Sequence, residues 1–388
     1  MKKIGFISDL HLGLTTNDLD RTNEIISVCF DFVKYVVKNK LNYVVFGGDI
    51  FHNNNPSEFL IGQFLRVLNL LQKYNKKTYI IVGNHDAITS ESRKSCLDFI
   101  NKLTFYPDIK LISDIKCFKI FDTDIGKIYF TFIPHITKAH LEDSKYNTTQ
   151  KYIDGKAKSV LKKVNSGNHN IVFSHLNVKG VIPSIENNFL KKSSVFLPEI
   201  FLDGIDLPVI IQGHIHSKNV VDNINIVGSP IYVTFGETDK NKYFSVINVP
   251  DTFGEKSSVE FIKTNAIKFL EFTLDFTNYK DSMLDIFDSD EFLNKVKGKI
   301  IKLNITVDEE FKSIEWDKIL KNVIENCVYL KPVVPKVIRK KIRRDENQRI
   351  DLCPVEAVKV WFTKNKTKNI QAKFKLAKKI IMECDENT

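Results

Sequence analysis

Short apolar runs and amphipathic segments alternate along the first part of the chain. Apolar runs of four to six residues that end in polar ones predict strands, and apolar residues three or four positions apart predict helices. The predicted order is strand, helix, strand, helix, strand, over residues 3–8, 21–38, 43–47, a helix that follows Ser57, and 78–82. This order predicts an α/β fold whose strands deliver polar residues at their carboxyl ends.

More strands are predicted after this α/β unit. They cover residues 127–133, 170–173, 209–212 and 224–227, and the last two flank a turn rich in histidine. The alternation over 244–262 also predicts β-structure. We therefore expect a first domain over residues 1–265.

Two smaller parts are expected beyond this domain. Residues 266–330 predict a small α+β capping domain with elements at 269–274, 290–297, 299–307 and 313–326. Residues 331–388 predict a basic linker followed by two C-terminal helices near 355–364 and 369–382. Pro354 suits the first turn of the first of these helices.

The positive charge is concentrated near the C-terminus. Residues 331–380 contain sixteen Lys and Arg but four acidic residues, a net of +12 that exceeds the +10 of the whole chain. The first 330 residues are therefore close to neutral. The basic segment is interpreted either as a solvated lysine-rich face or as an arm that meets DNA phosphates or an acidic partner.

Composition narrows the class of protein. A hydrophobic content of 43% is enough for a packed core, which excludes a wholly disordered chain. Since no apolar stretch reaches about 18 residues, no membrane span is expected. The six cysteines form no C-x-x-C pair, so a zinc ribbon or disulfide framework is not expected. A reducing, cytoplasmic setting fits this cysteine usage, the host cytoplasm if the source is viral.

Candidate metal ligands cluster in five short motifs, most of them at predicted strand ends. The motifs are Asp9-Leu10-His11, Gly48-Asp49, Gly83-Asn84-His85-Asp86, Ser174-His175 and Gly213-His214-Ile215-His216. Five of the nine histidines lie in these motifs, and His52 follows Asp49 by three positions. The other histidines, His135, His140 and His169, are interpreted as structural or surface residues.

These residue types suit a pair of divalent ions. Residues i and i+2 of a strand face the same way, so Asp9 and His11 are expected in one pocket, and His214 and His216 likewise. Imidazole, carboxylate and amide donors suit Mn²⁺, Fe²⁺ or Zn²⁺. A carboxylate between two such sets can bridge two ions that together activate water and stabilise an in-line displacement at phosphorus.

The order D-x-H, G-D, G-N-H-D, S-H, G-H-x-H over residues 9–216 resembles the calcineurin-like metallophosphoesterases. The resemblance implies a two-sheet α/β sandwich flanked by helices, with two divalent metal ions, for which we expect Mn²⁺. It implies that the first ion is held by Asp9, His11, Asp49 and His216. It implies that Asp49 bridges to a second ion held by Asn84, His175 and His214.

The same resemblance assigns a different role to His85. This residue would act on the scissile phosphate and protonate the leaving oxygen instead of binding a metal. Asp86 is either a support that fixes an imidazole or a carboxylate that stabilises a turn. His52 is either a residue that helps to place the DNA strand or a loop histidine.

Within this superfamily, residues 48–57 resemble the SbcD-type nucleases. Their sequence, GDIFHNNNPS, combines a G-D-x-F-H motif with a Pro-Ser helix start, although Asn55 stands where an arginine is common. The resemblance implies a metal-dependent exonuclease or endonuclease that hydrolyses phosphodiester bonds at DNA ends or hairpins. The alternative is a stand-alone metallophosphoesterase for small phosphodiesters or phosphomonoesters. Because every ligand position is filled, an inactive scaffold is disfavoured.

The resemblance also implies partners. The C-terminal helices would bind the coiled coil of an SbcC-type SMC-like ATPase that acts with the nuclease in recombination, repair or phage replication. A homodimer would form through helices near 57–72 and 90–102, although Phe64, Leu65 and Leu68 could equally be ordinary core residues.

Overall fold

The computed structural model forms two compact units, residues up to 307 with 313–336, and 308–312 with 337–388. The structure describes the following residues: 2–90, 93–103, 105–123, 126–142, 144–162, 164, 169–181, 195–202, 208–238, 240–250, 257–277, 281–311, 314–338, 354–365 and 369–385.

Two six-stranded sheets form the centre of the first unit. The first sheet has the order β16-β15-β1-β4-β5-β8, with β1 parallel to β4, β4 to β5 and β5 to β8. Its strands are β1 (Lys2–Ile7), β4 (Tyr43–Phe46), β5 (Lys77–Ile81), β8 (Ile109–Ile112), β15 (Tyr243–Val249) and β16 (Ser258–Lys263). The β-structure predicted over 244–262 therefore forms an antiparallel pair at the edge of this sheet.

The second sheet has the order β13-β14-β12-β11-β10-β9. Its strands are β9 (Lys116–Thr123), β10 (Gly126–Ile133), β11 (His169–Ser174), β12 (Val209–Gln212), β13 (Asn219–Val221) and β14 (Ile224–Ile226). β10, β11 and β12 run parallel, so their carboxyl ends meet at one edge. β8 and β9 were not anticipated from the sequence.

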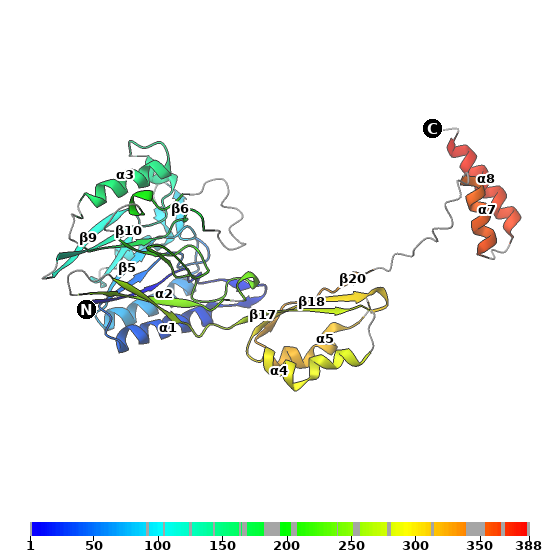
Figure 1. Ribbon diagram of the computed structural model, residues 1–388, viewed down its shortest axis with the longest axis horizontal. Helices are drawn as coiled ribbons and strands as arrows, with labels where there is room; N and C mark the ends of the chain where they lie inside the picture. The colour runs from blue at the N-terminus through cyan, green and yellow to red at the C-terminus, as the bar shows by residue number, and fades with distance from the viewer. Residues whose placement is uncertain are drawn as a thin grey trace. The chain divides into compact units, whose positions relative to one another are not determined.

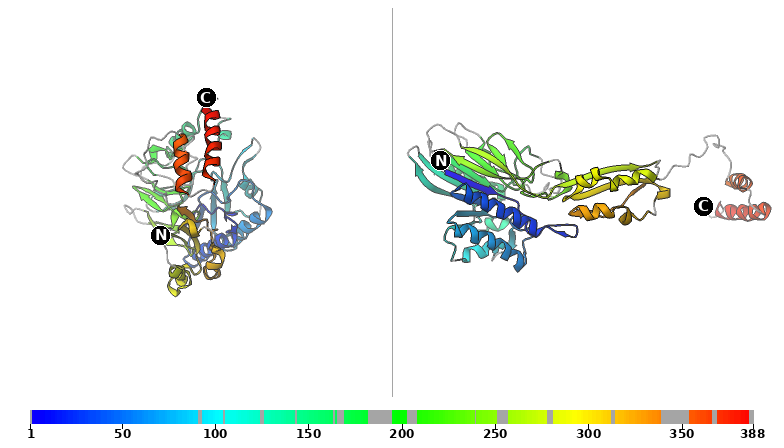
Figure 2. Two further views of the ribbon diagram at one scale, coloured as in Figure 1. Left: turned by 90° about the vertical axis from the view of Figure 1, so that its right-hand side faces the viewer. Right: turned by 90° about the horizontal axis from the view of Figure 1, so that it is seen from below.

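Helices cover the outer faces of both sheets. α1 (Thr22–Lys38) and α2 (Glu58–Lys73) lie side by side over the first sheet (Figure 1, Figure 2), and α3 (Thr149–Leu161) packs on the second. As predicted, the Ser57 side chain caps α2 by accepting a hydrogen bond from the Leu60 amide. The predicted two-sheet α/β sandwich is confirmed.

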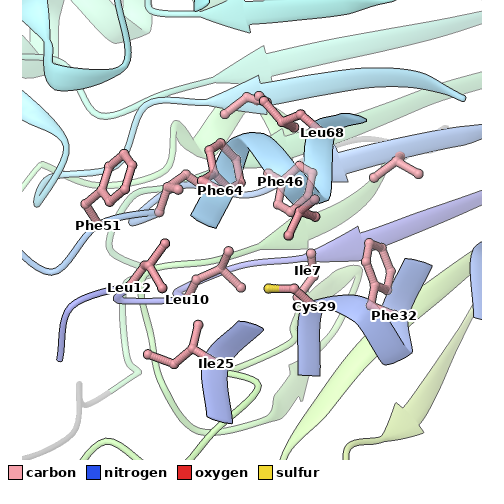
Figure 3. Packing of buried hydrophobic residues seen from close by; sticks show 14 of the residues in the cluster. Ile7, Leu10, Leu12, Ile25, Cys29, Phe32, Phe46, Phe51, Phe64 and Leu68 are labelled. Carbon is pink, nitrogen blue, oxygen red and sulfur yellow. The ribbon is translucent and has the colours of Figure 1, made fainter. Parts of the chain in front are cut away.

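Strand periodicity divides the first sheet between two cores. Ile7 and Phe46 face α1 and α2, where they pack with Phe32 and Phe64 (Figure 3). Residues of opposite parity, such as Phe6, face the second sheet and contribute to a core rich in aromatic rings. The strands of the first sheet are therefore buried on both faces, which fixes the positions of their carboxyl ends.

One prediction of secondary structure in this region is wrong. The helix expected near 90–102 is a hairpin of β6 (Ala87–Ser90) and β7 (Arg93–Ser95) followed by the 3₁₀-helix η1 (Cys96–Lys102). Ser95 caps η1 through a capping box with Asp98, so helical structure starts only at Cys96. The remaining short elements are β2 (Thr15–Thr16), β3 (Leu19–Asp20), η2 (Lys138–Leu141), η4 (Glu199–Phe201) and η5 (Phe235–Glu237).

A smaller sheet follows within the first unit. β17 (Phe269–Phe276), β18 (Ile300–Asp308) and β19 (Tyr329–Leu330) are parallel neighbours, accompanied by η6 (Asp281–Asp288) and α4 (Asp290–Val296). The single helix predicted over 313–326 is two short helices, α5 (Trp316–Ile319) and α6 (Lys321–Asn326). They are separated at Leu320, whose φ of −89° and ψ of 9° leave the helical region.

The second unit includes η7 (Glu309–Phe311), most of β20 (Lys336–Ile338), and the paired helices α7 (Pro354–Lys364) and α8 (Ile370–Asp385). Both helices occur where the sequence predicts them. Trp361 and Leu376 are 60% and 61% exposed. The basic run 339–344 lies outside the described residues. In the described part of the chain, no helix is long and apolar enough to cross a membrane.

Phe269, the first residue of β17, joins this smaller sheet to the two-sheet sandwich. Its fully buried ring stacks on Tyr232 with 5.8 Å between centroids, and the Arg21 guanidinium lies 4.9 Å from its centre. We expect Phe269→Ala to lower the free energy of unfolding by about 3–5 kcal/mol, because it leaves a cavity in this contact. Denaturant unfolding measures the change. The control is Phe59→Ala, at a ring 60% exposed, and an equal loss in both variants would contradict the expectation.

Candidate metal centre

All five motifs converge on the edge where the parallel strands of both sheets end. Asp9 and His11 follow β1, Asp49 follows β4, Asn84 and His85 follow β5, His175 follows β11, and His214 and His216 follow β12. Both aspartates and the histidines at 11, 175, 214 and 216 are at most 5% exposed. The structure therefore brings the residues expected to bind metal into one buried site.

One group of donors consists of Asp9, His11 and His216. Their potential ligand atoms lie within 4.8 Å of one another. The Nε2 atoms of His11 and His216 are 3.1 Å apart, so both rings direct the same nitrogen to the same point. The Asp9 carboxylate accepts a hydrogen bond of 2.9 Å from the His214 backbone amide, which fixes its orientation.

A second group consists of Asp49, His175 and His214, whose potential ligand atoms also lie within 4.8 Å of one another. His175 Nδ1 donates to the carbonyl oxygen of Gly47 over 2.7 Å. Its Nε2 atom is thereby left to face Asp49 Oδ2 at 3.3 Å and Asn84 Oδ1 at 3.1 Å. The Asn84 amide oxygen therefore belongs spatially to this second group.

Asp49 lies between the two groups. Its Oδ2 atom is 3.9 Å from His11 Nε2 and 3.3 Å from His175 Nε2. Its Oδ1 atom accepts a hydrogen bond of 2.8 Å from the His85 backbone amide. One carboxylate thus reaches both groups from a fixed position, as a bridging ligand must.

His85 and His52 lie beside the first group. His85 Nδ1 donates to the carbonyl oxygen of His52 over 2.7 Å, which leaves Nε2 as its other polar atom. The two rings stack with 5.6 Å between centroids. Both rings are half-buried, and with His11 they form a third set of ring nitrogens within 4.8 Å.

Residues 2–218 match the family model of the calcineurin-like phosphoesterases, which is more than half of the chain. The chain belongs to the calcineurin-like phosphoesterase family. The family resemblance inferred from the five motifs is confirmed. The calcineurin-like phosphoesterases have a dinuclear metal centre, and the two groups of donors in this chain could hold such a centre.

Curated relatives include nucleases and repair proteins. The chain is 21% identical to a subunit of the nuclease SbcCD from Staphylococcus epidermidis over 64% of this chain and 66% of that one, slightly under two thirds of its length. It is 24% identical to "DNA double-strand break repair protein Mre11" of Nanoarchaeum equitans, over 88% of this chain and 92% of that one. The protein of the same name from Methanococcus maripaludis is 23% identical over 98% and 95% of the two chains.

The donor set of this calcineurin-like phosphoesterase fits divalent cations electrostatically. Burial would raise the pKa of Asp49, but the neighbouring His175, together with His11 and His85, outweighs burial and holds that pKa well below its usual value. Burial, assisted by His175, lowers the pKa of His214 to about 3. Burial would also lower the pKa of His175, but the adjacent Asp49 raises it to about 9. An ionised bridge and a neutral His214 are the forms that bind a cation, and His175 would release a proton on binding.

The backbone of Asp9 and His11, and that of His214, does not have the strand geometry that the alternation rule assumes. Asp9, His11, Asp49 and His214 have positive φ angles of 56°, 49°, 50° and 73°. They lie in tight turns beyond the strand ends, where the two-residue alternation of a strand no longer applies. His214 and His216 accordingly point into different groups instead of one pocket.

Asp86 stabilises the turn that carries Asp49. Its buried carboxylate accepts hydrogen bonds from the backbone amides of Ile50, Phe51 and Gly83 over 3.0–3.1 Å. Of the two roles that the sequence leaves open for Asp86, these contacts match stabilisation of a turn.

Sequence reasoning missed three residues that support the ligands. Asn177 Oδ1 accepts from His214 Nε2 over 3.2 Å, which leaves Nδ1 for the site. Glu237 and Lys242 lie behind His216. Asn177 follows the S-H motif by two positions, a signal that was available, whereas Glu237 and Lys242 come from outside any motif.

Of the histidines outside the motifs, His140 has a structural role and His135 lies near the candidate metal centre. His140 Nε2 donates to the Ser113 carbonyl oxygen over 2.8 Å, in agreement with a structural role. His135 was interpreted in the same way, but it follows β10 at the edge that carries the metal centre. Burial and the nearby His175 lower its pKa to about 4.

Gly83 provides a direct test of the Asp49 position. A Cβ atom at residue 83 would lie 2.1 Å from Asp49 Oδ1 and 2.2 Å from its backbone nitrogen. We expect Gly83→Ala to displace this carboxylate and to lower Mn²⁺-dependent hydrolysis of a phosphodiester by about 100-fold. Steady-state kinetics and Mn²⁺ titration measure both effects.

The matched control is Gly62→Ala in α2, where a new Cβ meets nothing within 4 Å. This variant should keep full activity and gain about 0.5–1 kcal/mol of stability, because alanine favours the helix. Wild-type metal uptake and turnover in Gly83→Ala would contradict the role given to Asp49.

Proposed function

We propose that the chain is a Mn²⁺-dependent DNA nuclease of the SbcD type that hydrolyses phosphodiester bonds at DNA ends or hairpins. The observation that carries the proposal is the position of Asp49 between two groups of donors, with His85 beside them. The names of the staphylococcal and archaeal relatives, a nuclease subunit and a double-strand break repair protein, favour DNA as the substrate.

In this proposal Asp9, His11 and His216 hold one cation, Asn84, His175 and His214 hold the other, and Asp49 touches both. When bound, the cations supply neutralisation of the phosphodiester and activation of water. The chain's own contribution is orientation: His175 is fixed by Gly47 and His214 by Asn177, so each presents one defined nitrogen.

His85 is proposed to supply the proton for the leaving oxygen. Its Nδ1 proton is committed to the His52 carbonyl oxygen, so the transferred proton would come from Nε2. His52 stacks on this ring and is proposed to help place the DNA strand.

The charge distribution favours a nucleic acid over a small phosphoester. Residues 331–380 carry a net charge of +12. Such a charge attracts a polyanion such as DNA, which offers many phosphates, more strongly than a substrate with a single phosphate. The sheet of β17–β19 is proposed to act as a DNA-binding cap, within residues 266–330.

With a plasmid, an oligonucleotide and a phosphomonoester as substrates, we expect DNA cleavage in Mn²⁺ that EDTA abolishes.

Substitution of His85 separates the chemical step from metal binding. His85→Gln should retain two Mn²⁺ ions while kcat falls by about 10²–10⁴-fold, because the proton donor is lost. Asp49→Ala and His175→Ala should lose both metal and activity, and His52→Gln should chiefly raise KM for DNA.

Preference for the phosphomonoester would favour the alternative, a stand-alone phosphatase. Undiminished turnover by Asp49→Ala or His175→Ala would remove the proposed site.

The second unit is proposed to bind the coiled coil of an SbcC-type SMC-like ATPase. α7 and α8 pair with each other yet leave Trp361 and Leu376 largely exposed. Amphipathic helices with such residues commonly bind another helical surface. We further propose a homodimer through the region of α2 and a cytoplasmic location, the host cytoplasm if the source is viral.

A double substitution in the full chain tests the partner. Trp361→Ser with Leu376→Ser should abolish co-purification with the co-expressed ATPase while hydrolysis of a small phosphodiester is unchanged. Phe105→Ser is the control, since this ring is 88% exposed in the first unit. Unchanged co-purification in the double variant would exclude the two helices as the binding site.

A further inference from the structure

A buried ion pair lies directly behind His216. The side chains of Glu237, in η5, and Lys242, just before β15, contact each other and are 0% and 2% exposed. Glu237 Oε1 is 3.6 Å from His216 Nδ1. Lys242 Nζ donates to the His216 carbonyl oxygen over 3.0 Å and to Ser229 Oγ over 2.9 Å. The pair therefore contacts both the ring and the backbone of the same residue.

Stability alone does not explain this pair. Desolvation of two charges largely offsets their attraction, so buried ion pairs can often be replaced by neutral residues without loss of stability. Glu237 and Lys242 approach His216 from two sides, and its Nε2 atom faces His11 on the opposite edge of the ring. A carboxylate on the Nδ1 side of a histidine ring favours a proton on Nδ1, which leaves Nε2 to face the site.

The surrounding turn holds the pair rigidly. The Val233 amide donates to Glu237 Oε2 over 3.2 Å, and Lys242 Nζ lies 5.4 Å from the centre of the Tyr232 ring. The Ser229 amide donates to the His216 carbonyl oxygen over 3.1 Å. Gly228 permits this close approach, because its φ is 84° and a Cβ there would lie 2.8 Å from that oxygen.

We propose that Glu237 and Lys242 are positioning residues for the metal group formed by Asp9, His11 and His216. Glu237 orients the His216 imidazole from its Nδ1 side, and Lys242 holds Glu237 and the His216 carbonyl in place. This inference rests on the proposed dinuclear centre. It assigns Glu237 and Lys242 to the site of His216 and not to the site of His175 and His214.

The test measures metal affinity separately from folding. Mn²⁺ is titrated by calorimetry into the full-length wild type, Glu237→Gln, and the double variant Glu237→Gln with Lys242→Met. We expect the wild type to bind two ions, and both variants to lose about 10–100-fold in affinity at one site only. The single variant leaves Lys242 buried without its partner. The double variant removes both charges and should unfold at nearly the wild-type midpoint.

A matched control removes another ion pair. Glu271 and Lys302 form a partly buried bridge in the sheet of β17 and β18, so Glu271→Gln with Lys302→Met changes the same residue types away from His216. This control should bind both ions with wild-type affinity.

The outcomes separate this inference from the proposed function. Two ions bound at wild-type affinity by the folded double variant would overturn the role of Glu237 and Lys242 and leave the metal centre intact. A wild type that binds no Mn²⁺ would instead remove the dinuclear centre itself. Equal loss at both sites, or loss of affinity only in proportion to loss of folded protein, would show a general structural role and also overturn the inference.

Discussion

The site depends on one buried carboxylate that is shared by two clusters of imidazoles. Asp49 is 1% exposed, and burying its charge is unfavourable unless opposite charges or hydrogen-bond donors surround it. The donors are the His85 amide and His175, and they come from two different strand ends. Bound cations would complete this compensation, so metal binding and the convergence of the strands would stabilise the same arrangement.

The fold makes this arrangement possible by holding strained turns on rigid strands. Asp9, His11, Asp49 and His214 all have left-handed backbone conformations, which cost on the order of 1–2 kcal/mol each for residues with a side chain. The cores on both sides of β1 and β4 fix where these turns begin. Asp86 then adds three backbone hydrogen bonds below the Asp49 turn. Strain at the ligands is thus offset by burial elsewhere, as is common at functional sites.

The sequence predicts which candidate ligands come together, because residue types that suit a metal lie at the ends of predicted strands. Strand periodicity and the parallel strand order of an α/β fold are enough to predict that such residues meet at one edge. The failures have local causes. The alternation rule does not hold for His214 and His216, which lie beyond the strand end and enter different groups, and the helix expected near 90–102 is interrupted by a hairpin and the Ser95 cap.

Residues that act through another residue could not be found in this way. Glu237 and Lys242 occur in a turn without a motif, and their role follows only from contacts with His216, which is more than 20 positions earlier. Neither the charge nor the spacing of these two residues distinguishes them from surface Glu and Lys. Burial distinguishes them, and burial of a turn depends on tertiary packing.

The same turn also connects the metal centre with the smaller sheet. Lys242 lies over Tyr232, Tyr232 stacks on Phe269 at the start of β17, and Arg21 contacts both by donating to the Tyr232 carbonyl oxygen and covering the Phe269 ring. The Arg21 charge is balanced by Glu24, which also accepts from the Ile267 amide in the connection to β17. The side chains that orient His216 and those that anchor β17 therefore form one packed set. One candidate metal group is therefore in contact with the packing of β17, whereas the Asn84, His175 and His214 group is held by separate contacts to Gly47 and Asn177.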